Sequence, residues 1–273
     1  MSLTNITLTA AMRANLLSLQ STQNLFETTQ NRLSTGKKVN SALDNPIAYF
    51  AAKSYSDRAT DLSALKDNMN EAIQTVKAAD AGITAITDLV AQAKSIANSA
   101  LATSSTTDRS NYAAQFTTVR SQISNLAEDA SYKGTNLLQN SDLTVYFNED
   151  STNSLTINGF SADASTSGLS ISTPNAYWAS STHITSSISE LDTASTSLRT
   201  ESKSMSNNLA VVNTRLEFTT NMINTLNKGA DNLTLADMNE EGANLLMLQT
   251  RQALSTTALS LASQAAQSVL RLF

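Results

Sequence analysis

The sequence predicts a mainly α protein: an elongated antiparallel helical rod, similar to a coiled coil, with a small β-hairpin element and with N- and C-terminal helices paired at one end. Three observations predict this fold. The 273 residues include only 7 Gly and 2 Pro, so helical patterns run long without interruption. Apolar residues recur at alternating steps of three and four over most of the chain. Aromatic residues make up only 5% of the chain, which argues against a thick globular core.

The first predicted helix covers residues 10–33. Its seam alternates steps of four and three and includes two glutamines: Met12, Leu16, Leu19, Gln23, Phe26, Gln30 and Leu33. Gly36, Asn45 and Pro46 then break the pattern, which indicates a connector. Asp44 or Asn45 is placed to cap a new helix that begins at Pro46.

A long helix is predicted from Asp57 to Ala100. Its apolar residues from Leu62 onward follow alternating steps of three and four without error. At 1.5 Å per residue this helix would be roughly 65 Å long, more than a compact domain of this size can hold. Residues 102–110 end it and cap a shorter helix, with a seam from Tyr112 to Ala130, which we expect to fold back antiparallel.

The apolar pattern changes to a period of two after Asp142. Three short strands are predicted in D-L-T-V-Y-F, S-L-T-I-N-G-F and G-L-S-I-S, which gives β-hairpins at about 142–172. Residues 161–187 are rich in Ser and Thr and predict a surface loop. A second long helix returns from Ile184 to Leu226 and is predicted to stop at Gly229, followed by a linker at 230–242.

The last predicted helix, residues 244–273, carries two apolar stripes. The first stripe consists of Leu254, Ala258, Leu261, Ala265, Val269 and Leu272, and the second of Leu259, Ala262, Ala266, Leu270 and Phe273. This helix therefore needs apolar neighbours on two sides. We expect the N-terminal helix to cover one side and tails of neighbouring molecules to cover the other. Two ordinary core helices of one globular domain would explain the stripes equally well.

Self-assembly is thus the leading functional hypothesis. The residues expected to carry it are Met12, Leu16, Leu19, Phe26, Leu33, Leu254, Ala258, Leu261, Ala265, Val269, Leu270, Leu272 and Phe273. The domain plan has three segments: residues 1–45 form a tail and connector, 46–230 a helical rod with the hairpins, and 231–273 a connector and tail.

Charge is distributed unevenly along the chain. The net charge is −5, with +3 in residues 1–56, −10 in residues 57–242 and +2 in residues 243–273, which suits a solvated body and not nucleic-acid binding. The chain contains no cysteine, so disulfides and thiolate metal sites are excluded. No apolar run has membrane length, and the N-terminus lacks the basic-then-apolar order of a cleavable signal peptide. We expect export, if it occurs, to use another route.

No catalytic or cofactor motif is found in the sequence. There is no Gly-rich phosphate loop, no H-E-x-x-H and no nucleophile motif. His183, the single histidine, is expected to be solvated. Glu240 and Glu241 are adjacent and diverge on a helix, so we expect them to interact with the helix dipole and not to form an acid–base pair. The sequence predicts that the protein is not an enzyme and has no catalytic, cofactor-binding or metal site.

Three motifs resemble those of bacterial flagellins. R-L-S-T-G-K-K-V-N-S-A-L-D-N-P at 32–46 is similar to the signature that follows their first helix, and S-Y-K-G-T-N-L-L at 131–138 is similar to their turn motif. L-A-S-Q-A-A-Q-S-V-L-R-L-F at 261–273 resembles their C-terminal ending. The chain departs from the family pattern at I-T-L-T, residues 6–9, and at Ala266, where Pro is usual.

The resemblance implies a structural subunit that self-polymerises into the helical flagellar filament used for motility. It also implies an extracellular location, reached through the flagellar type III apparatus without a cleavable signal peptide. The tails, 1–45 and 231–273, would form an inner tube, and 46–230 an outer rod. Residues 142–182 are too short for a further outer domain, which implies a minimal flagellin. The implied partners are further copies of the chain, an export chaperone, the distal cap and junction proteins, with no nucleic acid and no membrane.

Two alternatives remain open from the sequence. A hook–filament junction protein would have similar helices without elongating into a filament. A secreted coiled-coil adhesin would bind glycans or membranes.

Overall fold

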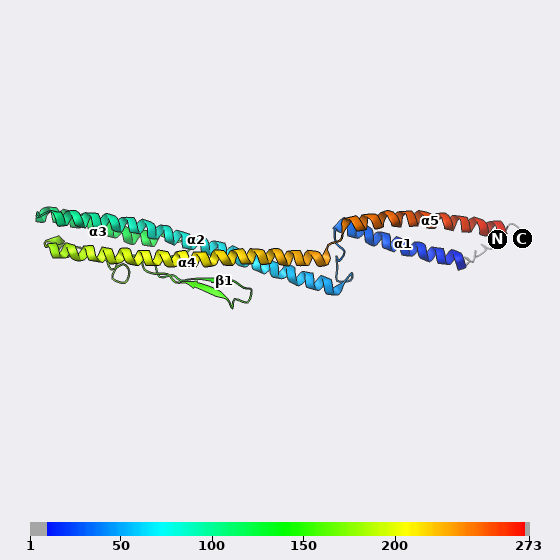
Figure 1. Ribbon diagram of the computed structural model, residues 1–273, viewed down its shortest axis with the longest axis horizontal. Helices are drawn as coiled ribbons and strands as arrows, with labels where there is room; N and C mark the ends of the chain where they lie inside the picture. The colour runs from blue at the N-terminus through cyan, green and yellow to red at the C-terminus, as the bar shows by residue number, and fades with distance from the viewer. Residues whose placement is uncertain (1–9, 271–273) are drawn as a thin grey trace, which may run out of the picture. The chain divides into compact units, whose positions relative to one another are not determined.

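The computed structural model describes residues 10–270, apart from the side chains of residues 11, 266, 269 and 270. The predicted mainly α class is confirmed there. The helices are α1 (Ala10–Thr35), α2 (Pro46–Ala102), α3 (Thr106–Asp129), α4 (Ser181–Thr234) and α5 (Met238–Leu270) (Figure 1). Strands β1 (Leu143–Tyr146) and β2 (Ser154–Ile157) form an antiparallel pair. The chain divides into two compact units: unit 1 is Met1–Asp57 with Thr225–Phe273, and unit 2 is Arg58–Asn224.

Unit 2 is built around one core shared by α2, α3 and α4. The seam predicted on α2 from Leu62 to Ala100 is buried, except that Leu65 is only partly buried. Ser202 Oγ of α4 donates a hydrogen bond to Asp80 Oδ1 of α2 at 3.0 Å, and Lys94 of α2 pairs with Asp192 of α4. Because residue numbers rise along α2 as they fall along α4, the two helices are antiparallel.

Helix α3 begins and ends with side-chain caps. The Ser105 side chain accepts a hydrogen bond from the backbone N–H of Asp108 at its start, within the run where the sequence predicted a cap. At its end, Asn136 Nδ2 donates to the backbone oxygens of Ala127 and Glu128 at 2.8 and 2.9 Å. The turn that carries Asn136 packs so closely on α2 that a Cβ at Gly82 would lie 2.7 Å from Leu138 Cδ1.

The β-hairpin is fixed to both long helices of unit 2. Val145 of β1 pairs with Leu155 of β2, and Val145 and Ile157 are buried. Arg58 Nε of α2 lies 2.6 Å from Glu149 Oε1 in the hairpin turn, and Arg215 of α4 lies over the Phe147 ring, 5.2 Å from its centroid.

The third predicted strand, G-L-S-I-S at 168–172, is wrong. This stretch is irregular because its backbone bonds to its own turn and to side chains. The Leu169 N–H donates to the Asp163 oxygen and the Ser172 N–H donates to Glu190 Oε2, both at 2.8 Å. Arg120 Nε donates to the Ile171 oxygen at 2.6 Å, and Arg120 Nη2 donates to the Ala164 oxygen at 3.1 Å. The arginine of α3 thus binds both ends of this irregular segment.

The prediction of a surface loop at 161–187 is also wrong, because its apolar residues enter the core of unit 2. The buried members are Ala162, Ala164, Leu169, Ile171 and Trp178, followed by Ile184 of α4. Trp178 ends a short turn, η1 (Asn175–Trp178), in which Ala176, Tyr177 and Trp178 have φ angles of 45°, 50° and 60°. The Trp178 ring packs edge-on against Phe116 of α3, with centroids 4.9 Å apart, and its Nε1 donates to Ser187 Oγ.

The two connectors of unit 1 pair with each other. Gly36 ends α1 with a φ of 72°, a conformation that favours glycine. Its carbonyl oxygen accepts from the backbone N–H of Ala236 at 3.0 Å, and the Thr234 oxygen accepts from the Lys38 N–H at 2.8 Å. The predicted stop at Gly229 is wrong: α4 continues through it to Thr234, and Gly229 faces the ring of Tyr55.

Helices α2 and α5 begin at polar caps. Asn45 Oδ1 accepts from the Ala48 N–H at 3.1 Å, which confirms the cap predicted before Pro46. Asp44 instead closes the connector. Its carboxylate accepts backbone hydrogen bonds from Ser41 and Asn40, and these lower the pKa of Asp44 below its ordinary value. Asp237 caps α5 by accepting from the Asn239 N–H at 2.9 Å.

Candidate functional site

Helices α1 and α5 lie side by side in unit 1 (Figure 1). Two side-chain contacts define their register. Arg32 Nη1 lies 3.0 Å from Glu241 Oε1, and Gln252 Nε2 donates to Gln23 Oε1 at 2.9 Å. Residue numbers fall along α1 as they rise along α5, so the pairing is antiparallel. The predicted pairing of the terminal helices is thereby confirmed.

Only one face of α5 turns toward α1. The residues of this face are buried or half-buried and follow alternating steps of four and three: Glu241, Leu245, Leu248, Gln252, Ser255, Leu259 and Ala262. Leu259 and Ala262 belong to the second stripe described from the sequence. That stripe is therefore the one that contacts the partner helix within the chain.

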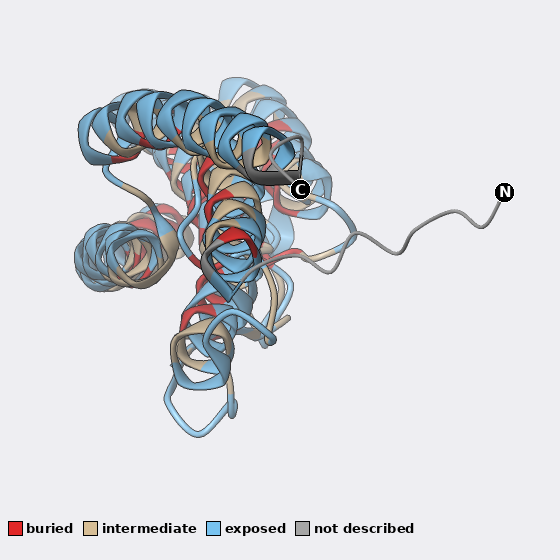
Figure 2. Cartoon of the chain, turned by 90° about the vertical axis from the view of Figure 1, so that its right-hand side faces the viewer, coloured by how far each residue is buried: buried red, intermediate tan, exposed pale blue. Residues whose placement is uncertain are grey.

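The described residues of the first stripe of α5 are not covered in unit 1. Leu254 and Leu261 are 66% and 63% exposed. Ala258, which lies between them in the sequence, and Ala265, which follows Leu261, are exposed as well. Figure 2 shows α5, the helix that leads to the C mark, pale blue over most of its surface. Scattered exposed leucines are normal, but a regular apolar row along one helix is typical of an interaction surface. We call Leu254, Ala258, Leu261 and Ala265 the outer stripe.

The other predicted assembly residues occupy several environments. Met12 is buried against the rest of unit 1, Leu19, Phe26 and Leu33 are half-buried, and Leu16 is exposed. Val269 and Leu270 lie in α5, but their side chains are not described. Leu272 and Phe273 lie outside the described residues. The structure thus buries or half-buries Met12, Leu19, Phe26 and Leu33, and leaves Leu16 and the outer stripe exposed.

Further exposed apolar residues of α1 and α5 were not among the predicted ones. Leu246 and Met247 are exposed on α5, and Leu17 and Leu25 are exposed on α1. Each is apolar and lies off the paired seam. Their spacing gave no separate signal in the sequence, because both helices carry apolar residues on more than one face.

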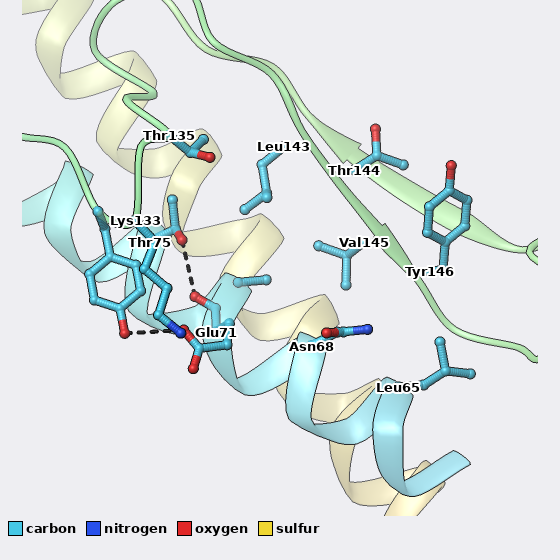
Figure 3. Close-up of a pocket in the computed structure, with 12 residues that line it drawn as sticks. Leu65, Asn68, Glu71, Thr75, Lys133, Thr135, Leu143, Thr144, Val145 and Tyr146 are labelled. Carbon is cyan, nitrogen blue, oxygen red and sulfur yellow. Dashed lines mark hydrogen bonds and ion pairs between the residues drawn. The ribbon is translucent and has the colours of Figure 1, made fainter. Parts of the chain in front are cut away.

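A groove of about 280 Å³ in unit 2 lies between α2, the turn at 132–135 and β1 (Figure 3). Its charged groups already pair with one another. The Glu71 carboxylate lies 2.9 Å from Lys133 Nζ and accepts from Tyr132 Oη at 3.1 Å, and these contacts lower the pKa of Glu71 and raise that of Lys133. Both charged groups of the groove are therefore engaged with each other.

His183 differs from its predicted environment. It lies half-buried in the first turn of α4, and its Nδ1 is buried without a hydrogen-bond partner. The expectation of a solvated histidine is therefore wrong for this atom. Within residues 10–270, no group of three His, Asp or Glu side chains is placed to hold a metal ion. No helix in that range is both long enough and apolar enough to cross a membrane.

Comparison with known proteins gives consistent results. Residues 6–142 match the family model of the bacterial flagellin N-terminal helical region. Flagellin FljK of Caulobacter vibrioides is 32% identical over 277 residues, covering 100% of both chains, and a flagellin of Brucella melitensis is 30% identical over 94% of this chain and 95% of its own. A crystal structure of Bacillus cereus flagellin aligns with 56% of this chain and 88% of its own, at 17% identity and a TM-score of 0.47. With a family model over half its length and similar flagellins over its whole length, this chain belongs to the bacterial flagellin family.

Proposed function

We propose that this flagellin polymerises because neighbouring copies cover the outer stripe of α5. Flagellins are subunits of the flagellar filament, so every exposed surface of this chain repeats along a polymer. A patch that contacts a different patch on the next copy generates an open helical assembly. The single observation that carries the proposal is the exposure of Leu254 and Leu261 in a helix that is already paired on its other face.

The residues proposed for this contact extend the outer stripe to both sides. Leu17 and Leu25 of α1 and Leu246 and Met247 of α5 are exposed apolar residues of the same helix pair. Fully burying one such side chain contributes about 1.5–3 kcal/mol. Several of them per copy would offset the loss of translational and rotational freedom on association.

The finer parts of the proposal follow from family membership. Residues 1–45 and 231–273 form the inner part of the filament, and residues 46–230 form the outer rod. An export chaperone, the distal cap and junction proteins are the further partners, and the type III apparatus exports the chain without a cleavable signal peptide. The role is structural, without catalysis or a cofactor.

Seeded polymerisation of the purified chain tests the proposed function. We expect salting-out to give seeds, and monomer added to these seeds to form sedimentable helical filaments visible by negative stain. The reaction should show a critical concentration, because growth is a binding equilibrium at the filament end. Helical monomers that never sediment, with or without seeds, would contradict the proposal and favour a junction protein that does not elongate.

A further inference from the structure

The seam between α1 and α5 is unusually polar for two paired helices. The α1 residues turned toward α5 are Met12, Asn15, Leu19, Thr22, Gln23, Phe26, Thr29, Arg32 and Leu33, and those of α5 include Glu241, Gln252 and Ser255. Apolar residues at these positions would stabilise the pair more strongly. Polar residues in a helix seam instead restrict which register and which partner can pair, at a cost in stability.

We propose that the contacts Arg32–Glu241 and Gln23–Gln252 select the pairing of α1 with α5 in a single register. The proposal rests on the proposed function, because correct pairing is what leaves the outer stripe facing the neighbouring copies.

Of the two contacts, Arg32–Glu241 is expected to be the more costly to lose. The Glu241 side chain is 9% exposed, and Arg32 supplies the ion pair that accompanies this burial. A buried carboxylate without a partner is strongly unfavourable. Pairing of two α1 helices or of two α5 helices cannot form this contact, because its two halves lie on different helices.

A slip of one heptad removes both contacts. Moving α5 by seven residues places Leu248 where Glu241 faces Arg32. The same movement places Leu259 where Gln252 faces Gln23. This slip therefore puts Arg32 and Gln23 against leucines, although the apolar positions of the seam would still coincide.

The two connectors also favour the pairing of α1 with α5, but they constrain only the end of the pair that carries Arg32 and Glu241. Their backbone hydrogen bonds lie between residues 36–39 and 234–236, next to Arg32 and Glu241. Gln23 is nine residues away from Arg32, or about 13 Å along α1. The glutamine pair therefore constrains the register of α1 and α5 at a point beyond the hydrogen bonds of the connectors.

Cysteine crosslinking of the full chain reads register and partner directly, because the chain contains no cysteine of its own. Leu19→Cys with Ser255→Cys reports the native register, since these positions lie four and three residues beyond the glutamine pair. Leu19→Cys with Ala262→Cys reports a one-heptad slip. On a non-reducing gel, a chain with an internal disulfide migrates as a monomer, and two chains joined by a disulfide migrate as a dimer.

The charge pair is tested in the native-register background. We expect Arg32→Glu to lower the rate of intrachain crosslinking by about tenfold or more, with slipped or interchain products in its place. Arg32→Glu with Glu241→Arg should restore the intrachain product. Glu240→Arg, at an exposed position beside Glu241, is the matched control and should leave the product unchanged. Native fluorescence of Trp178 in each variant shows that unit 2 remains folded.

The glutamine pair is tested by Gln252→Leu, which makes the seam more apolar. If Gln252 only stabilised the helix pair, the Gln252→Leu chain would keep the native register. We expect instead that the crosslink that reports the one-heptad slip increases about tenfold. An unchanged register in Arg32→Glu contradicts the role assigned to the charge pair, and so does a charge-swapped variant that does not regain the intrachain product. An unchanged register in Gln252→Leu contradicts the role assigned to the glutamine pair. If the Leu19→Cys, Ser255→Cys chain crosslinks in the native register while the unsubstituted chain does not polymerise, the proposed function is contradicted and this inference is not.

Discussion

Replacing Leu261 by Asp should abolish filament growth while leaving the monomer intact. Leu261 is 63% exposed in the single chain, so the new carboxylate stays in water and the α1–α5 pair keeps its contacts. In a filament that covers the outer stripe, the same carboxylate would be buried without a partner. A penalty of about 3 kcal/mol per copy raises the critical concentration roughly 100-fold. Sedimentation of seeded reactions measures this concentration, and amide hydrogen exchange in α1 and α5 measures the stability of the monomer.

Leu248→Asp is the matched control, because it places the same charge on the same helix but on the paired face. Leu248 is 4% exposed, so this variant should lose protection of the α1 and α5 amides already in the monomer. Normal seeded growth of Leu261→Asp would show that no neighbour covers the outer stripe. Lost amide protection in the Leu261→Asp monomer would show that the stripe packs within a single chain.

Replacing Trp178 by Ala should destabilise unit 2 by about 3–5 kcal/mol, the usual range for removing a large buried aromatic side chain. Trp178 is fully buried against Phe116 and holds a turn whose backbone is left-handed at three consecutive residues. Without the ring, neither the packing nor the turn conformation is supported. Urea unfolding followed by circular dichroism measures the change.

Tyr177→Ala is the control for Trp178→Ala, since Tyr177 lies next in the same turn but is 74% exposed. It should change the free energy of unfolding by no more than about 0.5 kcal/mol. Equal unfolding midpoints for wild type and Trp178→Ala would contradict the anchoring role. A large decrease in the free energy of unfolding of Tyr177→Ala would show that the turn itself, and not the buried ring, determines stability.

The long helices could be predicted from sequence because their cores repeat. On α2, apolar residues recur at alternating steps of three and four from Leu62 to Ala100, and helix geometry alone then places this series on one face. The same reasoning separated the two stripes of the last helix. Within the described part of α5, the structure assigns Leu259 to the paired face and Leu261 to the exposed one.

The irregular core could not be predicted, because it depends on contacts between distant residues. Trp178 lies in a segment rich in Ser and Thr, and its burial follows from Phe116, 62 positions earlier in the chain. Where a strand was expected at 168–172, the backbone bonds to the turn at 163–165 and to the side chains of Arg120 and Glu190, which no local pattern indicates. The Arg32–Glu241 pair joins residues 209 positions apart, so the sequence could place Glu241 in the first turn of a helix but could not identify its partner.

The central claim is that the outer stripe is free in the monomer and covered in the filament. Leu254→Cys introduces the chain's one thiol at the start of the stripe, and Leu248→Cys introduces it on the paired face as a control. We predict that a thiol reagent labels Leu254→Cys rapidly in the monomer and about 100-fold more slowly in sedimented filaments, while Leu248→Cys is protected in both. Equal labelling of Leu254→Cys in monomer and filament, or its protection already in the monomer, would contradict the claim.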